Sequence, residues 1–247
     1  MNDIARLPLV APWRWIQAGW DDFRASWPAS LFYGFVFAGM GRALSRVFAN
    51  AYEYVWALTS GFLLVGPFLA LGLYDLSRRR ERGQPLNLRP TLLAWRPNRA
   101  SLGIFSLVLG VLLLLWSRAS LVVVAVSFPD QLPSLGAFLD EATGSIQHLQ
   151  FLAAYCVVGG VFASLVFGIS VVSVPMMLDR DTDGIVAALT SVRSCLENPG
   201  VMAWWACLIT LLTAAGFLTS HLGLIVTTPL IGHATWHAYR ETVLPAP

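Results

Sequence analysis

The sequence contains no lysine, and charged residues of all kinds make up only 12% of its 247 positions. Soluble globular domains carry about twice that share of charge. Three cysteines are present, at Cys156, Cys195 and Cys207, and their spacing matches neither a zinc motif nor a disulfide framework. We therefore expect them to act as small buried hydrophobic side chains. These absences argue against an ordinary soluble domain and against a disulfide-stabilised scaffold.

Motifs that mark common enzymes are lacking as well. The sequence has no glycine-rich phosphate loop, no nucleophile elbow and no H-E-x-x-H zinc motif. The first residues include Asp3, Arg6 and Pro8 and no continuous apolar core, so we expect no removable signal peptide. The pattern of basic residues does not support nucleic-acid binding. We expect a protein without enzymatic activity, since a lipid-processing enzyme would need a nucleophile or a metal that the sequence does not display.

Long apolar runs are what the sequence has in abundance. Hydrophobic residues account for 56% of the chain, and its mean hydropathy is +0.64. A helix of about 20 apolar residues crosses the roughly 30 Å hydrocarbon core of a bilayer. We therefore predict an all-α membrane protein in which residues 1–247 form a single polytopic domain. The six predicted transmembrane spans are residues 29–49, 54–76, 101–127, 149–178, 201–219 and 222–239.

The positions of the arginines predict the orientation of these spans. Thirteen of the 16 arginines lie on one side: before the first span, between the second and third, between the fourth and fifth, or after the sixth. The other side has only Arg42, Arg46 and Arg118. By the positive-inside rule, we expect both termini in the cytoplasm and a periplasmic loop at about residues 129–148. The arginine run at residues 78–82 is expected to attract anionic lipid headgroups.

A repeated pattern links the second, fourth and sixth spans. Each contains one proline, followed by an apolar turn and a polar end. Short segments of mixed polarity that end in proline precede the odd-numbered spans and are typical of interfacial amphipathic helices. We predict three parallel two-helix repeats, related by an axis along the membrane normal. The predicted repeats are residues 13–82, 86–180 and 184–241.

The three repeated prolines are Pro67, Pro175 and Pro229. Because proline removes one amide donor and disturbs the carbonyl four residues earlier, a helix kink is expected at each of them. Nearby hydroxyl groups, such as those of Ser173 and Thr227, are suited to compensate the backbone in lipid. The sequence leaves open whether the kinks serve packing alone or open a cavity.

Ionisable residues gather at the predicted cytoplasmic ends of the three proline-bearing spans. Such groups at membrane depth usually pair with one another or mark a pathway. Two interpretations therefore remain open: polar helix ends that meet headgroups and neighbouring carboxylates, and a shallow ligand site that faces the cytoplasm. The candidate ligand-binding residues are Tyr74, Asp75, Arg78, Asp179, Arg180, His233, His237 and Arg240.

His233 and His237 lie four residues apart, on one face of the last predicted helix. Two histidines at this spacing can share a metal ion, but a zinc site needs a third and usually a fourth ligand. The other histidines, His148 and His221, are expected on the opposite side of the membrane. The pair is therefore a weak candidate for a metal site, and the sequence identifies no cofactor.

Several segments resemble a known bacterial family. The stretches "GFLLVGPFLALGLYDLSRRRERGQ", "SVVSVPMMLDRDTDGIVAALTSVRSCLENPG" and "GLIVTTPLIGHATWHAYR" are similar to the predicted integral membrane proteins called DUF2189. The resemblance extends from "RWIQAGWDDFRASW" to the final "HATWHAYR". It implies a multi-pass protein of the bacterial inner membrane and supplies no catalytic residue.

These patterns favour a small-solute or ion transporter, or a component of a membrane complex, with a polar site that faces the cytoplasm. The expected partners are a bilayer with anionic headgroups and either another membrane protein or a second copy of the chain. Loose names given to some family members refer to cytochrome oxidase. They imply an alternative, a metal- or haem-linked respiratory assembly factor that uses His233 and His237.

Overall fold

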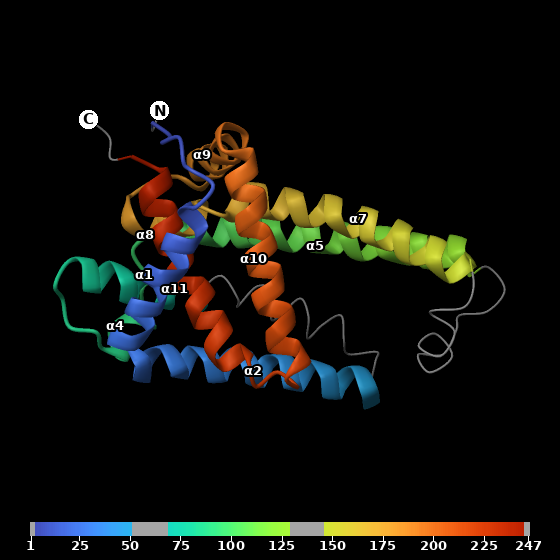
Figure 1. Cartoon of the computed structure of the whole chain (residues 1–247), viewed down its shortest axis with the longest axis horizontal. Helices are drawn as coiled ribbons and strands as arrows, with labels where there is room; N and C mark the ends of the chain where they lie inside the picture. The colour runs from blue at the N-terminus through green and yellow to red at the C-terminus, as the bar shows by residue number, and fades with distance from the viewer. Residues whose placement is uncertain (1–2, 51–68, 129–145, 245–247) are drawn as a thin grey trace. The chain divides into compact units, whose positions relative to one another are not determined.

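The structure is a computed structural model that describes residues 3–50, 69–128 and 146–244, with the side chains of all of these except 47–50. Within these ranges the regular secondary structure is helical (Figure 1), apart from one isolated antiparallel bridge between Ile4 and Val243. The prediction of an all-α chain is confirmed for this part.

The chain forms two compact units. The first consists of residues 1–107 and 168–247, and the second of residues 108–167. The candidate site described below lies within the first unit.

In the first unit, α1 (Ala11–Ala25) and α11 (Leu224–Thr242) lie side by side (Figure 1). Their backbones meet at a glycine. A Cβ atom built on Gly19 would lie 2.7 Å from the backbone nitrogen of Ala234, so a larger residue would force the two helices apart. Small residues permit this close approach between helices in membrane proteins.

Two further glycine contacts extend this packing. α2 (Trp27–Asn50) approaches α11 so closely that a Cβ atom on Gly34 would lie 2.0 Å from the carbonyl oxygen of Ile225. The helical residues 69–81 pack against α2 in turn, with Gly72 against the phenol group of Tyr33. These contacts join the four helical segments α1, α2, 69–81 and α11, which carry most of the candidate site.

A break separates α7 (Ile146–Ser170) from the short helix α8 (Ser173–Asp179). Pro175 is the third residue of α8, and it has no amide hydrogen for the carbonyl of Val171, which accounts for the turn just before α8. Pro229 lies inside the continuous helix α11. The third predicted kink, at Pro67, lies outside the described residues.

The other helices of the first unit are shorter or begin at clear signals. α10 (Pro199–Leu218) starts with proline at its first position, where the missing amide hydrogen has no cost. It follows α9 (Gly184–Glu197) directly, and Asn198 ends one helix and begins the other. α4 (Leu88–Thr91) is a single turn in the connection between residues 69–81 and α5 (Arg99–Ser127).

The second unit pairs α5 and α7 in antiparallel fashion. The ring of Trp116 meets that of Tyr155 at 6.2 Å, and the side-chain amide of Gln147 donates to the carbonyl oxygen of Ser127 at 2.6 Å. Many apolar side chains point outward, including Leu114, of which 61% is exposed. An apolar surface of this extent fits lipid rather than water.

Three helices among the described residues are long and apolar enough to cross a membrane: α5, the stretch Ile146–Asp179 that joins α7 and α8, and α10. They coincide with the predicted spans 101–127, 149–178 and 201–219. Spans 29–49 and 222–239 form the less apolar helices α2 and α11, and most of span 54–76 lies outside the described residues.

The two ends of the described chain are paired with each other. The amide of Ala5 donates to the carbonyl of Thr242 at 2.9 Å, and the amide of Leu244 donates to the carbonyl of Asp3 at 3.0 Å. The side-chain amide of Asn198 also donates to the carbonyl of Ala5, at 2.9 Å. The paired ends are therefore fixed to the start of α10.

Candidate functional site

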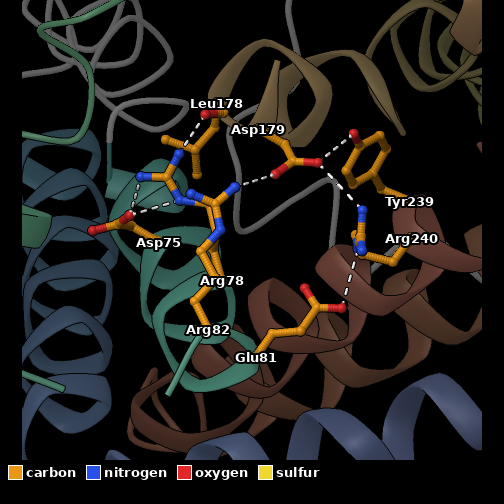
Figure 2. A network of polar contacts seen from close by, with 8 residues as sticks. All are labelled: Asp75, Arg78, Glu81, Arg82, Leu178, Asp179, Tyr239 and Arg240. Atoms are coloured by element: carbon orange, nitrogen blue, oxygen red, sulfur yellow. Dashed lines mark hydrogen bonds and ion pairs between the residues drawn. The ribbon is translucent and has the colours of Figure 1, made fainter. Parts of the chain in front are cut away.

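Ion pairs join three helix ends in the first unit. The C-terminal ends of residues 69–81, of α8 and of α11 meet there, and arginines reach between them (Figure 2). We call this cluster the ionic network. Its members are Asp75, Arg78, Arg79, Glu81, Arg82, Asp179, Tyr239 and Arg240.

Asp75 is the most deeply buried acid of the ionic network, with 1% of its surface exposed. Arg78 binds one carboxylate oxygen through Nη2 and through Nε, the latter at 3.1 Å. The Nε of Arg79 binds the other oxygen at 2.7 Å. Arg78 also donates to the carbonyl oxygen of Leu178 at 2.5 Å, as Figure 2 shows, so the Asp75 pairs are connected to the end of α8.

Asp179, the last residue of α8, connects the other two helix ends. Its Oδ1 accepts a hydrogen bond from Arg82 at 2.9 Å, and its Oδ2 accepts one from the hydroxyl of Tyr239 at 2.9 Å. Arg240 donates to Oδ2 at 3.4 Å and also binds Glu81 at 3.1 Å. A single carboxylate therefore holds the ends of residues 69–82 and of α11 together (Figure 2).

A second cluster, which we call the histidine network, connects α1, α2, residues 69–81 and α11. Its members are Asp22, Ser26, Ser30, Ser77, Arg80, His233 and His237. His233 is fully buried; its Nε2 hydrogen-bonds the hydroxyl of Ser30 at 2.9 Å, and its Nδ1 that of Ser77 at 2.8 Å. Both ring nitrogens thus have partners, as a buried imidazole requires.

Asp22 is the acid of the histidine network and is 3% exposed. It accepts hydrogen bonds from Arg80 at 2.5 Å and from the Nε2 of His237 at 2.8 Å. Burial alone would raise the pKa of Asp22, but its partners, above all His237, outweigh that effect and lower the pKa to about 2. The carboxyl group is therefore ionised at neutral pH.

Acid should remove the stabilisation that Asp22 provides. Because its pKa of about 2 in the fold is below the ordinary value of 3.8, the contribution is complete above about pH 4 and is lost as the pH falls toward 2. We expect Asp22→Asn to lower the thermal stability of the detergent-purified protein clearly at pH 7 and much less near the acid limit. The exposed neighbour gives the control, Asp21→Asn, which should change little at either pH. A difference for Asp22→Asn that stays constant on acidification would contradict this account.

The structure places most of the predicted ligand-binding residues in these two networks. Asp75, Arg78, Asp179 and Arg240 belong to the ionic network, and His233 and His237 belong to the histidine network. Tyr74 is buried next to Asp75 in the sequence. Arg180 instead donates to the carbonyls of Val243 and Leu244 and lies over the ring of Tyr239. That these residues bind a ligand stays a prediction.

Sequence reasoning missed Asp22, which joins α1 to the site. The buried residues of α1 include Trp15, Gly19, Asp22 and Phe23, so Asp22 belongs to the apolar stripe of an amphipathic helix. A carboxylate on such a stripe needs a partner, and this was an available signal. Ser30 and Ser77 carry no such signal in the sequence, because serine is common in membrane helices. The partner that they share, His233, is also far away along the chain.

The metal hypothesis for the histidine pair does not fit these contacts. A metal shared by His233 and His237 needs a ring nitrogen from each, and both nitrogens of His233 already bind serine hydroxyls. The described part of the chain also holds no group of three histidine, cysteine, aspartate or glutamate residues placed to bind one ion. We therefore derive no chemistry through a metal or a haem.

The described residues are helical, and three of their helices are long and apolar enough to cross a bilayer. Together with the buried ion pair at a helix end, these features define an integral membrane protein of the all-helical class. The family model of the predicted integral membrane proteins DUF2189 matches residues 55–179. That segment is just over half of the chain, and the protein belongs to this family. The match includes Asp75 and Asp179, whereas "GHATWHAYR" lies outside it. No curated protein and no solved structure matches the chain.

Proposed function

We propose that this protein has no catalytic role and acts as a component of a membrane complex, in which the two networks hold a fixed arrangement of helix ends at one membrane border. The observation that carries the proposal is the internal pairing of the buried carboxylates. Asp22, Asp75 and Asp179 each accept at least two hydrogen bonds from side chains of this chain. A transport site instead keeps polar groups available to its solute.

The balance of charge supports the same conclusion. Five arginines face four carboxylates across the two networks, and every one of the nine takes part in an ion pair. These residues are Arg78, Arg79, Arg80, Arg82, Arg240, Asp22, Asp75, Glu81 and Asp179. The side chains of Asp22, Asp75 and Asp179 are at most 10% exposed, and breaking the pair of a buried charge costs far more than a surface pair contributes, so the pairs of these three carboxylates fix geometry. The exposed pair of Arg240 and Glu81 contributes little. A fixed surface is what a subunit of a larger assembly needs.

For the membrane arrangement, we propose six spans in three parallel repeats, with both termini in the cytoplasm of a bacterial cell and the chain in the inner membrane. The arginine distribution supports this orientation. The repeat is supported by the meeting of corresponding helix ends: Asp75, Asp179 and Arg240 all follow a proline-bearing segment, and all join the ionic network. Fusions of a reporter enzyme to each connection would test the number of spans.

The role in a complex can be tested against transport. In membranes solubilised with a mild detergent, we expect the protein to migrate on native gels well above its 27.0 kDa monomer, with a second copy or another membrane protein. Asp75→Asn and Asp179→Asn should release the monomer, and the exposed Asp181→Asn should not.

Proteoliposomes of the purified protein should leak protons and potassium no faster than protein-free vesicles. Migration as a monomer, together with gradient-driven flux that Asp75→Asn abolishes, would establish the transport alternative instead.

A further inference from the structure

The arginines that follow the run at residues 78–82 differ from the arginines within it. Arg78, Arg79, Arg80 and Arg82 are all held by carboxylates, so the charge of the run that is expected to attract anionic lipid is neutralised by acids of the same chain. The connection that follows and the first residue of α5 carry three more arginines, and none of these has an ion-pair partner among the described residues. They are Arg89, Arg96 and Arg99, and all three are exposed.

These arginines belong to residues 88–99, which we call the anchor segment. One side of the segment is fixed to the first unit: Thr91 is buried and shares a 2.9 Å hydrogen bond with the hydroxyl of Tyr33. Its end is fixed as well, because the side-chain amide of Asn98 donates to the carbonyls of Met177 and Thr182. The anchor segment therefore has a defined inner side, and its arginines cannot be explained as a disordered basic loop.

The outer side of the anchor segment combines cations with apolar side chains. Leu92 is 41% exposed and Leu93 is 43% exposed, between the exposed Arg89 and Arg96. Leucines flanked by arginines make an amphipathic surface of the kind that lies at the boundary between headgroups and acyl chains. An aqueous surface would gain nothing from the two leucines.

The position of the anchor segment along the chain agrees with this boundary. Arg99 is the first residue of α5, a candidate membrane-spanning helix, and residues 100–117 carry no charge before Arg118. At 1.5 Å per residue, the distance along the helix from Arg99 to Arg118 is about 28 Å, close to the thickness of the hydrocarbon core. The anchor segment thus ends where the bilayer begins.

We propose that the anchor segment binds anionic phospholipid: the guanidinium groups of Arg89, Arg96 and Arg99 contact headgroup phosphates, and Leu92 and Leu93 enter the acyl region. Charge complementarity and continuity with α5 carry this proposal. It rests on the membrane location of the chain and not on its role in a complex, so either can fail without the other.

Titration with a fluorescent short-chain phosphatidylglycerol in zwitterionic detergent tests the proposal. Each of Arg89→Gln, Arg96→Gln and Arg99→Gln should weaken binding by about fivefold, the usual effect of one basic residue at an anionic surface. The matched controls are Arg42→Gln and Arg118→Gln, which remove exposed arginines elsewhere and should leave the affinity unchanged. Equal losses in all five variants would show a general charge effect and overturn the proposal. Competition by inorganic phosphate as strong as that by the lipid would also overturn it, because the site would then be one for free phosphate.

A depth measurement tests the position of the leucines. In a chain with Cys156, Cys195 and Cys207 replaced by alanine, a fluorophore on Leu92→Cys should be quenched by brominated phosphatidylglycerol in nanodiscs. The same fluorophore on the exposed Gln84→Cys should be quenched much less. If the two positions are quenched equally, the anchor segment does not enter the bilayer. A second set of nanodiscs carries the bromine on the zwitterionic lipid and not on the phosphatidylglycerol. We expect the fluorophore on Leu92→Cys to lose its quenching there, because anionic lipid is enriched around this position.

Discussion

Gly34→Ala should destabilise the folded protein by about 3 kcal/mol, the upper part of the range for overpacking a close contact. The added Cβ atom would lie 2.0 Å from the carbonyl oxygen of Ile225, and that oxygen belongs to the backbone of α11. A backbone atom cannot rotate away, so the whole helix would have to shift. Such a shift would also move His233 relative to Ser30, since these two residues join the same pair of helices. Thermal unfolding of the detergent-purified protein measures the effect.

The same helix provides the control. Gly39 also lies in α2, but a Cβ atom there would meet nothing within 4 Å. Gly39→Ala should be neutral or should stabilise the protein by about 0.5–1 kcal/mol, because alanine favours a helix over glycine. Equal destabilisation by both substitutions would mean that the close approach of α2 and α11 is not the cause.

Asp75→Asn should destabilise the protein by about 3 kcal/mol, the lower end of the range for breaking a buried ion pair. Asparagine has the size of aspartate but no charge, so Arg78 and Arg79 would keep their positive charges beside a neutral group. The lower end applies because these arginine side chains are 20% and 21% exposed and can gain some hydration. Chemical denaturation in detergent provides the free energy of unfolding.

Two further variants distinguish pairing from a general effect of charge. Asp181→Asn removes an exposed carboxylate close to α8 and should change the stability by less than about 0.5 kcal/mol. The double variant Asp75→Asn/Arg79→Gln should be less destabilised than the sum of its single variants, because the second change removes a cation that the first left without a partner. Additive losses would indicate that Asp75 and Arg79 do not act as a pair.

Apolar composition was enough to predict the helical class and the three most apolar spans. A helix surrounded by lipid has apolar residues on all sides, so a continuous apolar run such as residues 101–127 can be recognised as a membrane span without knowledge of any contact. The charged helix ends were also visible, because ionisable groups at membrane depth are few. The sequence alone therefore indicates Asp75 and Asp179 as candidates, without their partners.

The pairing of these groups could not be predicted from the sequence. The spacing of His233 and His237 indicates a possible metal pair, but the partners of His233 are serines on two other helical segments. Helix packing alone decides which hydroxyls reach an imidazole. For the same reason, the role of Asp22 depends on Gly19, which allows α1 to approach α11 closely. Contacts of this kind follow from tertiary structure and leave little trace in periodicity.

The pairing of the two chain ends restricts how often the chain crosses the bilayer. Ile4 and Val243 form a backbone bridge, so both must lie on one side of the membrane. A chain that returns to the side from which it started has made an even number of crossings, whereas the described residues contain three helices long and apolar enough to cross, which is an odd number. If all three of these helices cross the bilayer, at least one further crossing lies elsewhere, either in a less apolar helix such as α2 or α11 or in the part of the chain outside the described residues. Parity thus provides a test of membrane topology that does not depend on any hydropathy threshold.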